Sequence, residues 1–416
     1  MNPQILNNKI SIRSCCRICK NLNLFLFLDF DKMPMPDGHI DPDDQQSVFI
    51  NNLSIYWCPQ CGIVQTLHDV DLSSYYSEYD YSVSHSQFTM NFMDNFATDV
   101  ISRFNISTGD VIYEIGSGDG QQLSYFRNIG ADVVGFEPSL SLASLAAEKG
   151  IDTIRGYFCE KNVSRLSDNM KKVKLIICQY TFDHIPDPLS FLEDISKVLD
   201  PEQGVAIFEV HDFEKIVERN EACLFTHEHF LYLTIESFRK LLNRCDFKII
   251  SYNFLSETIC RGNSLIVAAS LNSSNHESEL IFQSNLLLEL KNKERYIIFS
   301  EAVAKSHSQL KRFIHDQHRK GNIVAGYGAA GRGVNTLCIA GLTNKDIYCV
   351  FDINENLHGK LMPGSNVPVL PPSAIFDSTV DMVIVFSYGY LDEIRAALKP
   401  YLKKGGQMIS ILDLLK

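Results

Sequence analysis

The stretch Val111–Leu123, which reads V-I-Y-E-I-G-S-G-D-G-Q-Q-L, constrains the fold of this chain more than any other. A short apolar run includes the acidic residue Glu114, and Gly116, Gly118 and Gly120 follow at every second position. Glycines in this pattern let the backbone turn tightly from a strand into a helix, and they let a ligand approach the main chain. The stretch therefore predicts a strand, a ligand-binding loop and a helix in succession.

A second acidic signal follows in V-V-G-F-E-P, where Glu137 ends another apolar run 17 positions after Gly120. This is the spacing at which the second strand of a Rossmann-type unit presents a carboxylate to ribose hydroxyls. Glu137 could instead cap the helix that Pro138 begins. The E-x-G-x-G-x-G spacing differs from the G-x-G-x-x-G of dinucleotide sites, and it resembles motif I of S-adenosylmethionine (SAM) methyltransferases. The resemblance implies a SAM site that includes Glu114, the three glycines and Glu137.

Strands and helices alternate between residues 111 and 269, which predicts a doubly wound α/β sheet. The expected strands cover residues 111–115, 133–136, 175–179, 204–210, 247–253 and 265–270. The expected helices cover residues 87–104, 121–129, 141–149, 188–198 and 235–244. Doubly wound sheets bind ligands at the carboxyl ends of their strands, so Gln179 at the end of the third strand is assigned to the cofactor site.

Four of the 12 cysteines form two C-x-x-C pairs, Cys16 with Cys19 and Cys58 with Cys61. The start of the chain has no signal-peptide hydrophobic core, so we expect a cytoplasmic protein whose cysteines stay reduced. Two such pairs predict a structural zinc site, because four thiolates leave no open coordination position. Cys15 could replace Cys16, although the C-x-x-C register favours Cys16. The alternative is four unrelated buried thiols.

The length of 416 residues predicts two or three domains. The net charge of -12 argues against a nucleic-acid partner, whose phosphates would repel an acidic protein. No apolar run has the length of a transmembrane helix, so no membrane partner is expected.

Polar side chains after two predicted strands are candidates for chemistry. His184 lies in Y-T-F-D-H-I-P-D-P, and His227, Glu228 and His229 lie in T-H-E-H. The two histidines of H-E-H are two positions apart, and no helix would place that spacing on one face. Either can serve as a general base because histidine titrates near neutral pH, and Glu228 could orient a ring or stay solvated. The tyrosine-rich stretch 72–85 suits a lid or a sugar-contacting wall, or the packing of a domain junction.

A second glycine loop follows the predicted strand that begins at Ile323. Gly326, Gly328 and Gly331 satisfy G-x-G-x-x-G, and Asp352 ends the next predicted strand 21 residues later. This pattern is typical of an NAD site, although Arg332 beside the loop would also suit the phosphate of another nucleotide. An NAD-dependent nucleotide-sugar oxidoreductase that uses Gly326–Gly331 is therefore an alternative.

Together these stretches resemble the SAM-dependent sugar C-methyltransferases of deoxysugar biosynthesis over nearly the whole chain. The resemblance implies a zinc-binding module (1–72), a Rossmann-like SAM methyltransferase domain (73–271), and a second Rossmann-like domain (272–416) that helps to hold a nucleotide sugar. Its third domain is marked by G-K, P-G and V-P within residues 359–368. The family methylates C3 of nucleotide-linked 4-keto-6-deoxyhexoses, so this substrate class is expected, with no need for NAD. A monomer is expected.

By position, the resemblance implies that His229 is the base and that His184 and Tyr81 line the sugar. It places Glu228 at the same site. Methylation at carbon needs such a set: a base for the proton next to the carbonyl, and donors for the oxyanion that forms. Two positions depart from the family. Thr226 stands where a tyrosine is common, so Tyr81, Tyr232 or another tyrosine could supply the phenol. Asp183 precedes His184, where a small or apolar residue is more common.

Overall fold

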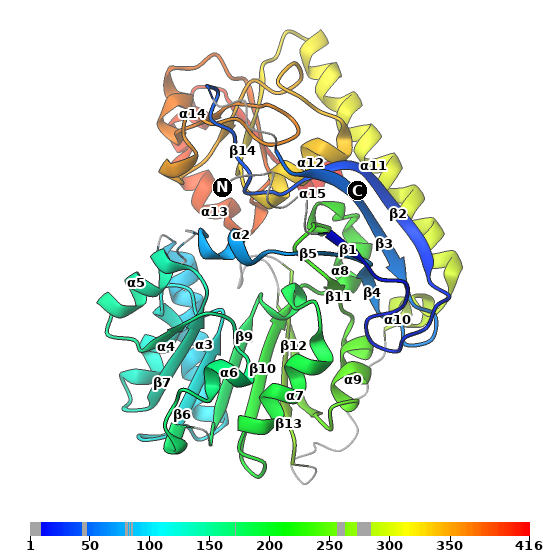
Figure 1. Cartoon of the computed structure of the whole chain (residues 1–416). Helices are drawn as coiled ribbons and strands as arrows, with labels where there is room; N and C mark the ends of the chain where they lie inside the picture. Colours follow the sequence, from blue (N-terminus) through cyan, green and yellow to red (C-terminus); the bar gives the residue numbers. More distant parts are fainter. Residues whose placement is uncertain are drawn as a thin grey trace.

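The computed structural model of the protein describes residues 10–43, 48–79, 82, 84, 86–170, 172–255, 263–272 and 284–416. Figure 1 shows one α/β unit formed by the middle of the chain and another formed by its C-terminal part, with the N-terminal strands beside them. Tyr81 lies outside the described residues. None of the helices in the described residues is long and apolar enough to cross a membrane.

Within the described residues, the central unit contains a sheet of seven strands in the order β12-β13-β10-β9-β6-β7-β8. The strands are β6 (Val111–Ile115), β7 (Asp132–Glu137), β8 (Thr153–Arg155), β9 (Leu175–Gln179), β10 (Val205–Val210), β12 (Lys248–Leu255) and β13 (Ser264–Ser270). Strands β8, β7, β6, β9 and β10 run parallel, whereas β13 pairs antiparallel with β10 and β12. The carboxyl ends of the parallel strands therefore share one edge, which faces α2 (Ser73–Ser77) in Figure 1.

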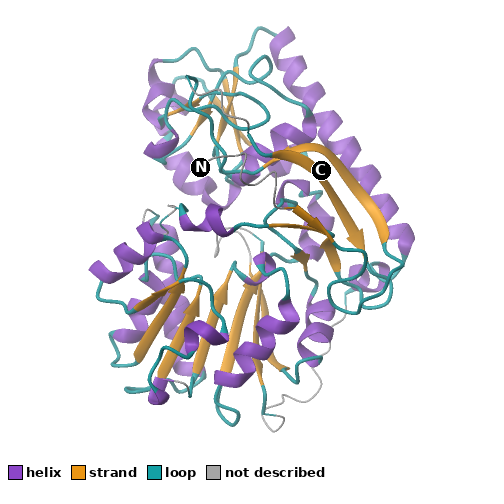
Figure 2. Ribbon diagram, viewed as in Figure 1, coloured by secondary structure: helices purple, strands orange, loops and turns teal. Residues whose placement is uncertain are grey.

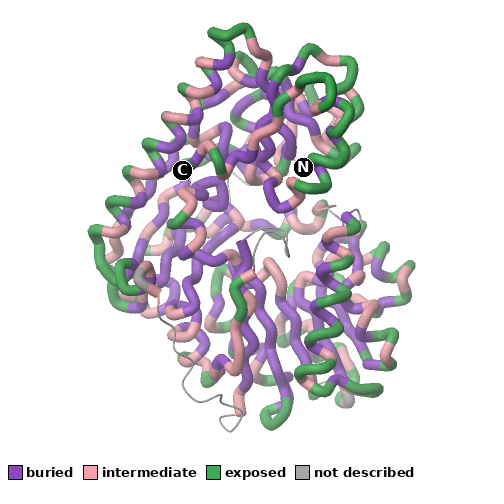
Figure 3. Tube along the Cα trace, turned by 180° about the vertical axis from the view of Figure 1, so that it is seen from behind, coloured by how far each residue is buried: buried purple, intermediate pink, exposed green. Residues whose placement is uncertain are grey.

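Helices of the central unit cover both faces of this sheet (Figure 2), except α8, which packs on the N-terminal strands and on α11. They are α3 (Gln87–Arg103), α4 (Gln121–Arg127), α5 (Leu140–Glu148), α6 (Glu160–Val163), α7 (Pro188–Val198), α8 (Phe213–Arg219) and α9 (Ile235–Asn243). Strands β6 and β10 are buried at every position, as expected when helices cover both faces of a parallel sheet. Figure 3 shows the same contrast between buried strands and exposed outer surfaces of helices.

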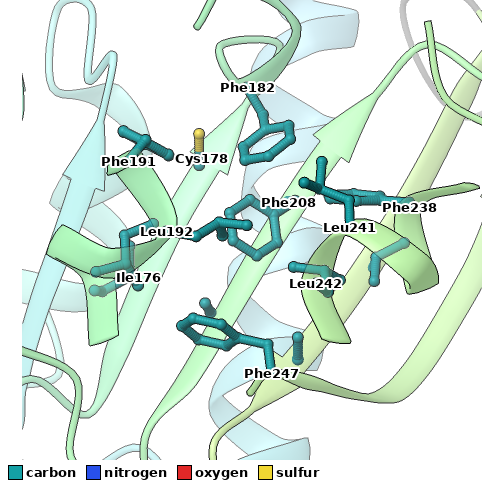
Figure 4. Close-up of a cluster of buried hydrophobic side chains, with 14 of the residues drawn as sticks. Ile176, Cys178, Phe182, Phe191, Leu192, Phe208, Phe238, Leu241, Leu242 and Phe247 are labelled. Carbon is teal, nitrogen blue, oxygen red and sulfur yellow. The ribbon is translucent and has the colours of Figure 1, made fainter. Parts of the chain in front are cut away.

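The mixed α/β fold was expected, and the predicted strands and helices of this unit appear within a few residues of their expected bounds. Strand β8 was not predicted, because its residues T-I-R contain one apolar side chain and none is fully buried. The core beneath the site joins Phe182, Phe208 and Phe238, whose ring centroids lie 5.1 to 5.5 Å apart (Figure 4). These rings anchor the loop after β9 on the sheet and on α9.

The N-terminal residues form two small sheets. Their strands are β1 (Ile10–Ile12), β2 (Phe25–Pro34), β3 (Ile50–Trp57), β4 (Val64–Thr66) and β5 (His68–Val70). Strands β2, β3 and β4 make an antiparallel sheet that β11 (Leu231–Tyr232) extends, and β1 pairs with β5. Because β11 begins two residues after His229, the H-E-H segment connects the central unit to the N-terminal sheet.

The C-terminal unit is a second, all-parallel sheet in the order β16-β15-β14-β17-β18. Its strands are β14 (Val324–Tyr327), β15 (Val350–Phe351), β16 (Val369–Leu370), β17 (Met382–Val385) and β18 (Gln407–Ser410). Its helices are α12 (Gly331–Ala340), α13 (Leu391–Ala397), α14 (Lys399–Lys403) and α15 (Ile411–Leu414). Two helices precede this unit, α10 (Asn285–Glu289) and α11 (Lys293–Arg319), and α11 packs beside β2.

Candidate active site

The first glycine loop has the left-handed backbone that only glycine adopts readily. The φ angles of Gly116, Gly118 and Gly120 are +72°, +53° and +73°. A Cβ on Gly116 would lie 2.3 Å from Oγ1 of Thr181, so this glycine lets the loops after β6 and β9 approach closely. A Cβ on Gly118 would meet nothing within 4 Å. The main chain at Gly118 therefore borders open space where a ligand can lie.

Glu137 braces this loop from the end of β7. It is 6% exposed, and its carboxylate accepts hydrogen bonds from the N–H of Gly118 at 3.0 Å and of Ser139 at 2.8 Å. Burial raises the pKa of Glu137, and the two N–H groups oppose that rise. The alternative that Glu137 caps a helix begun by Pro138 is wrong, because α5 begins at Leu140 and its N-cap is Ser139, whose N–H bonds to Glu137.

The other two residues assigned to the cofactor site lie at the ends of β6 and β9. Glu114 is 5% exposed in β6. Gln179 donates from Nε2 to Oε2 of Glu209 at 2.6 Å, across the parallel pair of β9 and β10. Glu209 is fully buried and also accepts a 2.6 Å hydrogen bond from Ser264.

Two serines that follow α2 in the sequence contact the glycine loop. Ser82 and Ser84 both donate to Oδ2 of Asp119 at 2.5 Å, and Nζ of Lys149 lies 3.1 Å from the same oxygen. Burial disfavours the ionised form of Asp119, but these partners together hold its pKa below the usual value. Ser82 and Ser84 of the tyrosine-rich stretch therefore contact the glycine loop through Asp119, and residues 73–77 of the same stretch form helix α2.

His184, Glu228 and His229 lie together at the carboxyl ends of β9 and β10. The ring centroids of His184 and His229 are 4.6 Å apart, and Oε2 of Glu228 is 4.0 Å from Nδ1 of His184. The phenol of Tyr76 lies 2.5 Å from Nδ1 of His184. Tyr76, on α2, thus contacts His184 directly, Tyr75 of the same helix hydrogen-bonds Glu228, and the Tyr232 ring lies 6.1 Å from that of His229, centroid to centroid. Tyr81 falls outside the described residues.

The two histidines of H-E-H face different surroundings, as their spacing indicated. His227 is fully buried against the N-terminal sheet, where Nδ1 lies 3.0 Å from Nε2 of His68 and Nε2 lies 3.0 Å from the carbonyl of Met33. His229 instead faces His184. Thr226 contacts Tyr232, because its N–H donates to the Tyr232 hydroxyl at 3.2 Å.

His229 has a fixed tautomer. Its Nδ1 lies 3.0 Å from the carbonyl oxygen of Leu224, and a carbonyl can only accept, so Nδ1 carries the hydrogen and Nε2 has a lone pair. Burial lowers the pKa of His229 to about 3, and the negative charge of Asp183 partly opposes this effect. The neutral ring therefore presents Nε2 as a proton acceptor.

Glu228 has the opposite character. Burial, reinforced by the charges of Asp37 and Asp183, raises its pKa to about 8. The carboxyl group is then largely protonated at pH 7, and it can donate a hydrogen bond.

Sequence reasoning missed His211. This residue follows β10 directly, and its Nδ1 lies 3.0 Å from Oδ2 of Asp183, which is 2% exposed. Its position at the carboxyl end of a buried strand was the available signal.

The four predicted zinc ligands lie together. Sγ of Cys16 is 3.6 Å from Sγ of Cys61, and Sγ of Cys19 is 3.4 Å from Sγ of Cys58. Four thiolates at about 2.3 Å from one zinc ion would be about 3.8 Å apart, so the sulfur positions fit a tetrahedral site. The amide of Gln65 donates to Sγ of Cys16 at 3.1 Å, which favours a thiolate there.

The second glycine loop is packed against the N-terminal residues. The N–H of Ala329 donates to Asp352 at 2.7 Å, and Nε2 of His39 lies 3.0 Å from the carbonyl of Ala329. A Cβ on Gly331 would lie 3.7 Å from Pro36. Protein atoms therefore lie beside this loop, in contrast to the open space at Gly118.

Comparisons with known proteins match the chain in three consecutive parts. The matching families are a zinc-binding domain over residues 16–76, a methyltransferase domain over residues 91–252, and a C-methyltransferase C-terminal domain over residues 260–412. The C-methyltransferase NovU of Streptomyces niveus is 25% identical over 399 residues, which cover 95% of this chain and 94% of that protein.

Solved methyltransferases match part of the chain at low similarity. Magnesium protoporphyrin IX methyltransferase from Synechocystis PCC 6803 is 16% identical over 47% of this chain and 90% of its own, with a TM-score of 0.35. An S-adenosylmethionine-dependent methyltransferase from Clostridium acetobutylicum is 14% identical over 44% of this chain and 92% of its own, with a TM-score of 0.35. The three consecutive family matches and the similarity to NovU along nearly the whole chain support a C-methyltransferase family for this protein.

Proposed function

We propose that this protein uses SAM to methylate C3 of a nucleotide-linked 4-keto-6-deoxyhexose, through an enolate, in deoxysugar biosynthesis. The observation that carries the proposal is the state of His229, whose Nδ1–H bonds to the Leu224 carbonyl and leaves Nε2 as an acceptor. This group lies at the same edge of the sheet as the open glycine loop. A base and a methyl-donor loop at one edge are what methylation at carbon requires.

The residues that would hold SAM are Glu114, Gly116, Gly118, Gly120, Glu137 and Gln179. When bound, SAM supplies an electrophilic methyl group on a sulfonium. The open space at Gly118 and the buried carboxylate of Glu137 fit a ligand that needs close main-chain approach and a hydrogen-bond acceptor for its ribose.

In the proposed reaction, Nε2 of His229 removes the C3 proton of the sugar. The neutral carboxyl of Glu228 and the paired side chains of Tyr76 and His184 are donors for the oxyanion that develops at C4. Tyr81 remains a proposed contact of the sugar. The C-terminal unit is proposed to hold the nucleotide.

Zn²⁺ is proposed to occupy the Cys16, Cys19, Cys58 and Cys61 cluster. Because four thiolates fill the tetrahedron, the metal would stabilise the fold and take no part in the chemistry.

Deuterium exchange at C3 tests the base. With S-adenosylhomocysteine replacing SAM in D₂O, the protein should catalyse exchange at C3, and His229→Gln should slow it by about 100-fold or more. Binding of SAM should not change. The exposed His318→Gln variant is the control. Full exchange by His229→Gln would contradict the assignment.

Equilibrium binding separates this proposal from the NAD-dependent alternative. We expect SAM to bind and NAD not to bind. NAD binding that is lost on changing the Gly326–Gly331 loop, without SAM binding, would support the oxidoreductase instead.

A further inference from the structure

The candidate active site contains a buried carboxylate surrounded by imidazoles. Asp183 lies in the short turn η3 (Phe182–His184), and its ion-pair partners among the described residues are His184 and His211. Oδ2 of Asp183 is 3.0 Å from Nδ1 of His211, and Oδ1 is 3.8 Å from Nε2 of His184. Oδ1 accepts no hydrogen bond from the described residues.

Backbone contacts hold this carboxylate beside His229. The N–H of Phe230, the residue after His229, donates to the carbonyl of Asp183 at 2.8 Å. One ring nitrogen each of His211 and His229 and one oxygen of Asp183 all lie within 4.8 Å of one another. Backbone contacts therefore set the position of Asp183 next to His229.

We propose that Asp183 is the countercharge for His229 when His229 takes the C3 proton, and that His211 is a positioning residue that holds the Asp183 carboxylate. The inference rests on the proposed function. In the step concerned, the C3–H bond breaks, its electron pair stays on the sugar as the enolate, and the proton moves to Nε2 of His229. Asp183 remains ionised and transfers no proton.

Burial makes such a countercharge necessary. His229 is 7% exposed, and an imidazolium formed there without a negative partner would be strongly disfavoured. Burial lowers the pKa of His229 to about 3, which means that it disfavours the protonated ring, and the negative charge of Asp183 opposes this effect. Although burial also disfavours ionised Asp183, its neighbours His229, His211 and His184 keep the Asp183 pKa well below the usual value.

His211 is itself held in place. A carboxylate can only accept, so Nδ1 of His211 donates to Asp183. The His211 ring also packs on Tyr180, with 4.9 Å between the ring centroids. Tyr180 has a φ of +48°, which is costly for an aromatic residue and is retained where the surrounding structure fixes it.

The test compares variants in the C3 exchange assay, with S-adenosylhomocysteine bound. Asp183→Asn keeps the shape and removes the charge, so kcat for exchange should fall by about 100-fold while KM for the sugar stays within about twofold. In His211→Ala, kcat for exchange should fall by about 10-fold or more. His211→Asn should recover much of that rate, because its amide can replace the Nδ1 donor. The exposed Asp132→Asn substitution is the control.

The pH profile supplies a readout that a structural role would not move. The groups around His229 that carry or gain charge are Asp183, His184, His211, Glu228 and Tyr232. Removing the negative charge of Asp183 lowers the His229 pKa, so the acidic limb of the exchange profile should move to lower pH while the plateau falls. An unmoved or upward-moved limb, or exchange by Asp183→Asn within threefold of the unaltered protein, would overturn the inference.

The competing outcome is a divalent metal held by Asp183, His211 and His229. We expect one zinc per chain, lost on substituting Cys16 and retained in Asp183→Asn. A second metal equivalent that Asp183→Asn loses would overturn the countercharge role.

If the unaltered protein exchanges no C3 hydrogen of any 4-keto sugar, the proposed function is wrong, and this inference is wrong with it. Exchange that persists unchanged in Asp183→Asn overturns the inference alone.

Discussion

The phenol oxygen of Tyr76 lies 2.5 Å from Nδ1 of His184, which joins helix α2 to the loop after β9. The two residues are 108 positions apart in the sequence. Their contact brings the tyrosine-rich stretch to the carboxyl edge of the central sheet, where the candidate base His229 lies.

Tyr76→Phe should reduce methyl transfer by about 10- to 100-fold, because it removes a donor from the group proposed to stabilise the oxyanion. SAM affinity should be unchanged, since Tyr76 contacts the histidine cluster. Tyr348→Phe, at a tyrosine that is 52% exposed, is the matched control. Turnover by Tyr76→Phe equal to that of the control would remove Tyr76 from the proposed oxyanion site.

Glu137→Gln should weaken SAM binding by about 10-fold or more, because a charge-assisted acceptor at the glycine loop is replaced by a neutral one. Isothermal titration of SAM into each protein measures the effect. The same substitution at Glu148, exposed at the end of α5, should leave the affinity unchanged. Equal affinities for the Glu137 and Glu148 variants would restrict Glu137 to its structural hydrogen bonds.

Methyl transfer should decline as the pH rises through about 8, where Glu228 loses its proton. The direction follows from the raised pKa: below it the carboxyl group is neutral and can donate, and above it the donor is replaced by a charge. Glu228→Gln keeps a neutral donor, so its alkaline limb should flatten. A profile for Glu228→Gln that falls as the unaltered profile does would show that another group controls this limb.

Cys16→Ser should remove one zinc per chain and lower the melting temperature, because a structural zinc site contributes to folding free energy. Cys15→Ser changes the adjacent thiol, which lies outside the cysteine cluster, and it should keep both zinc and stability. Metal analysis combined with thermal unfolding measures both. Chelation, like Cys58→Ser, should unfold the protein before it affects chemistry. An unaltered melting temperature in zinc-free protein would argue against a structural metal.

The fold of the central unit was largely readable from the sequence. Strands such as β6 and β10 are continuous apolar runs, and α7 begins at Pro188 after the capping residue Asp187. Strand β8 could not be predicted because it is a short edge strand stabilised by pairing with β7. Strands β11 and β4 pair although they lie far apart in the sequence, and no local sequence pattern predicts this pairing.

The candidate site was readable only in part. H-E-H spacing indicated that His227 and His229 would face apart, and they do. The partners of His229 depend on how the ends of β9 and β10 meet, so neither His211 nor the role of Asp183 followed from spacing. Tyr76 illustrates the same limit, because nothing local distinguishes it from the other tyrosines of its stretch.

The most direct test is incubation of the full chain with SAM and a panel of dTDP-, GDP- and CDP-linked 4-keto-6-deoxyhexoses. Mass spectrometry should find a sugar nucleotide that gains one methyl group, and NMR should place that group on C3. Methylation at oxygen or at another carbon, or a SAM-bound protein that methylates none of these sugars, would contradict the proposed function.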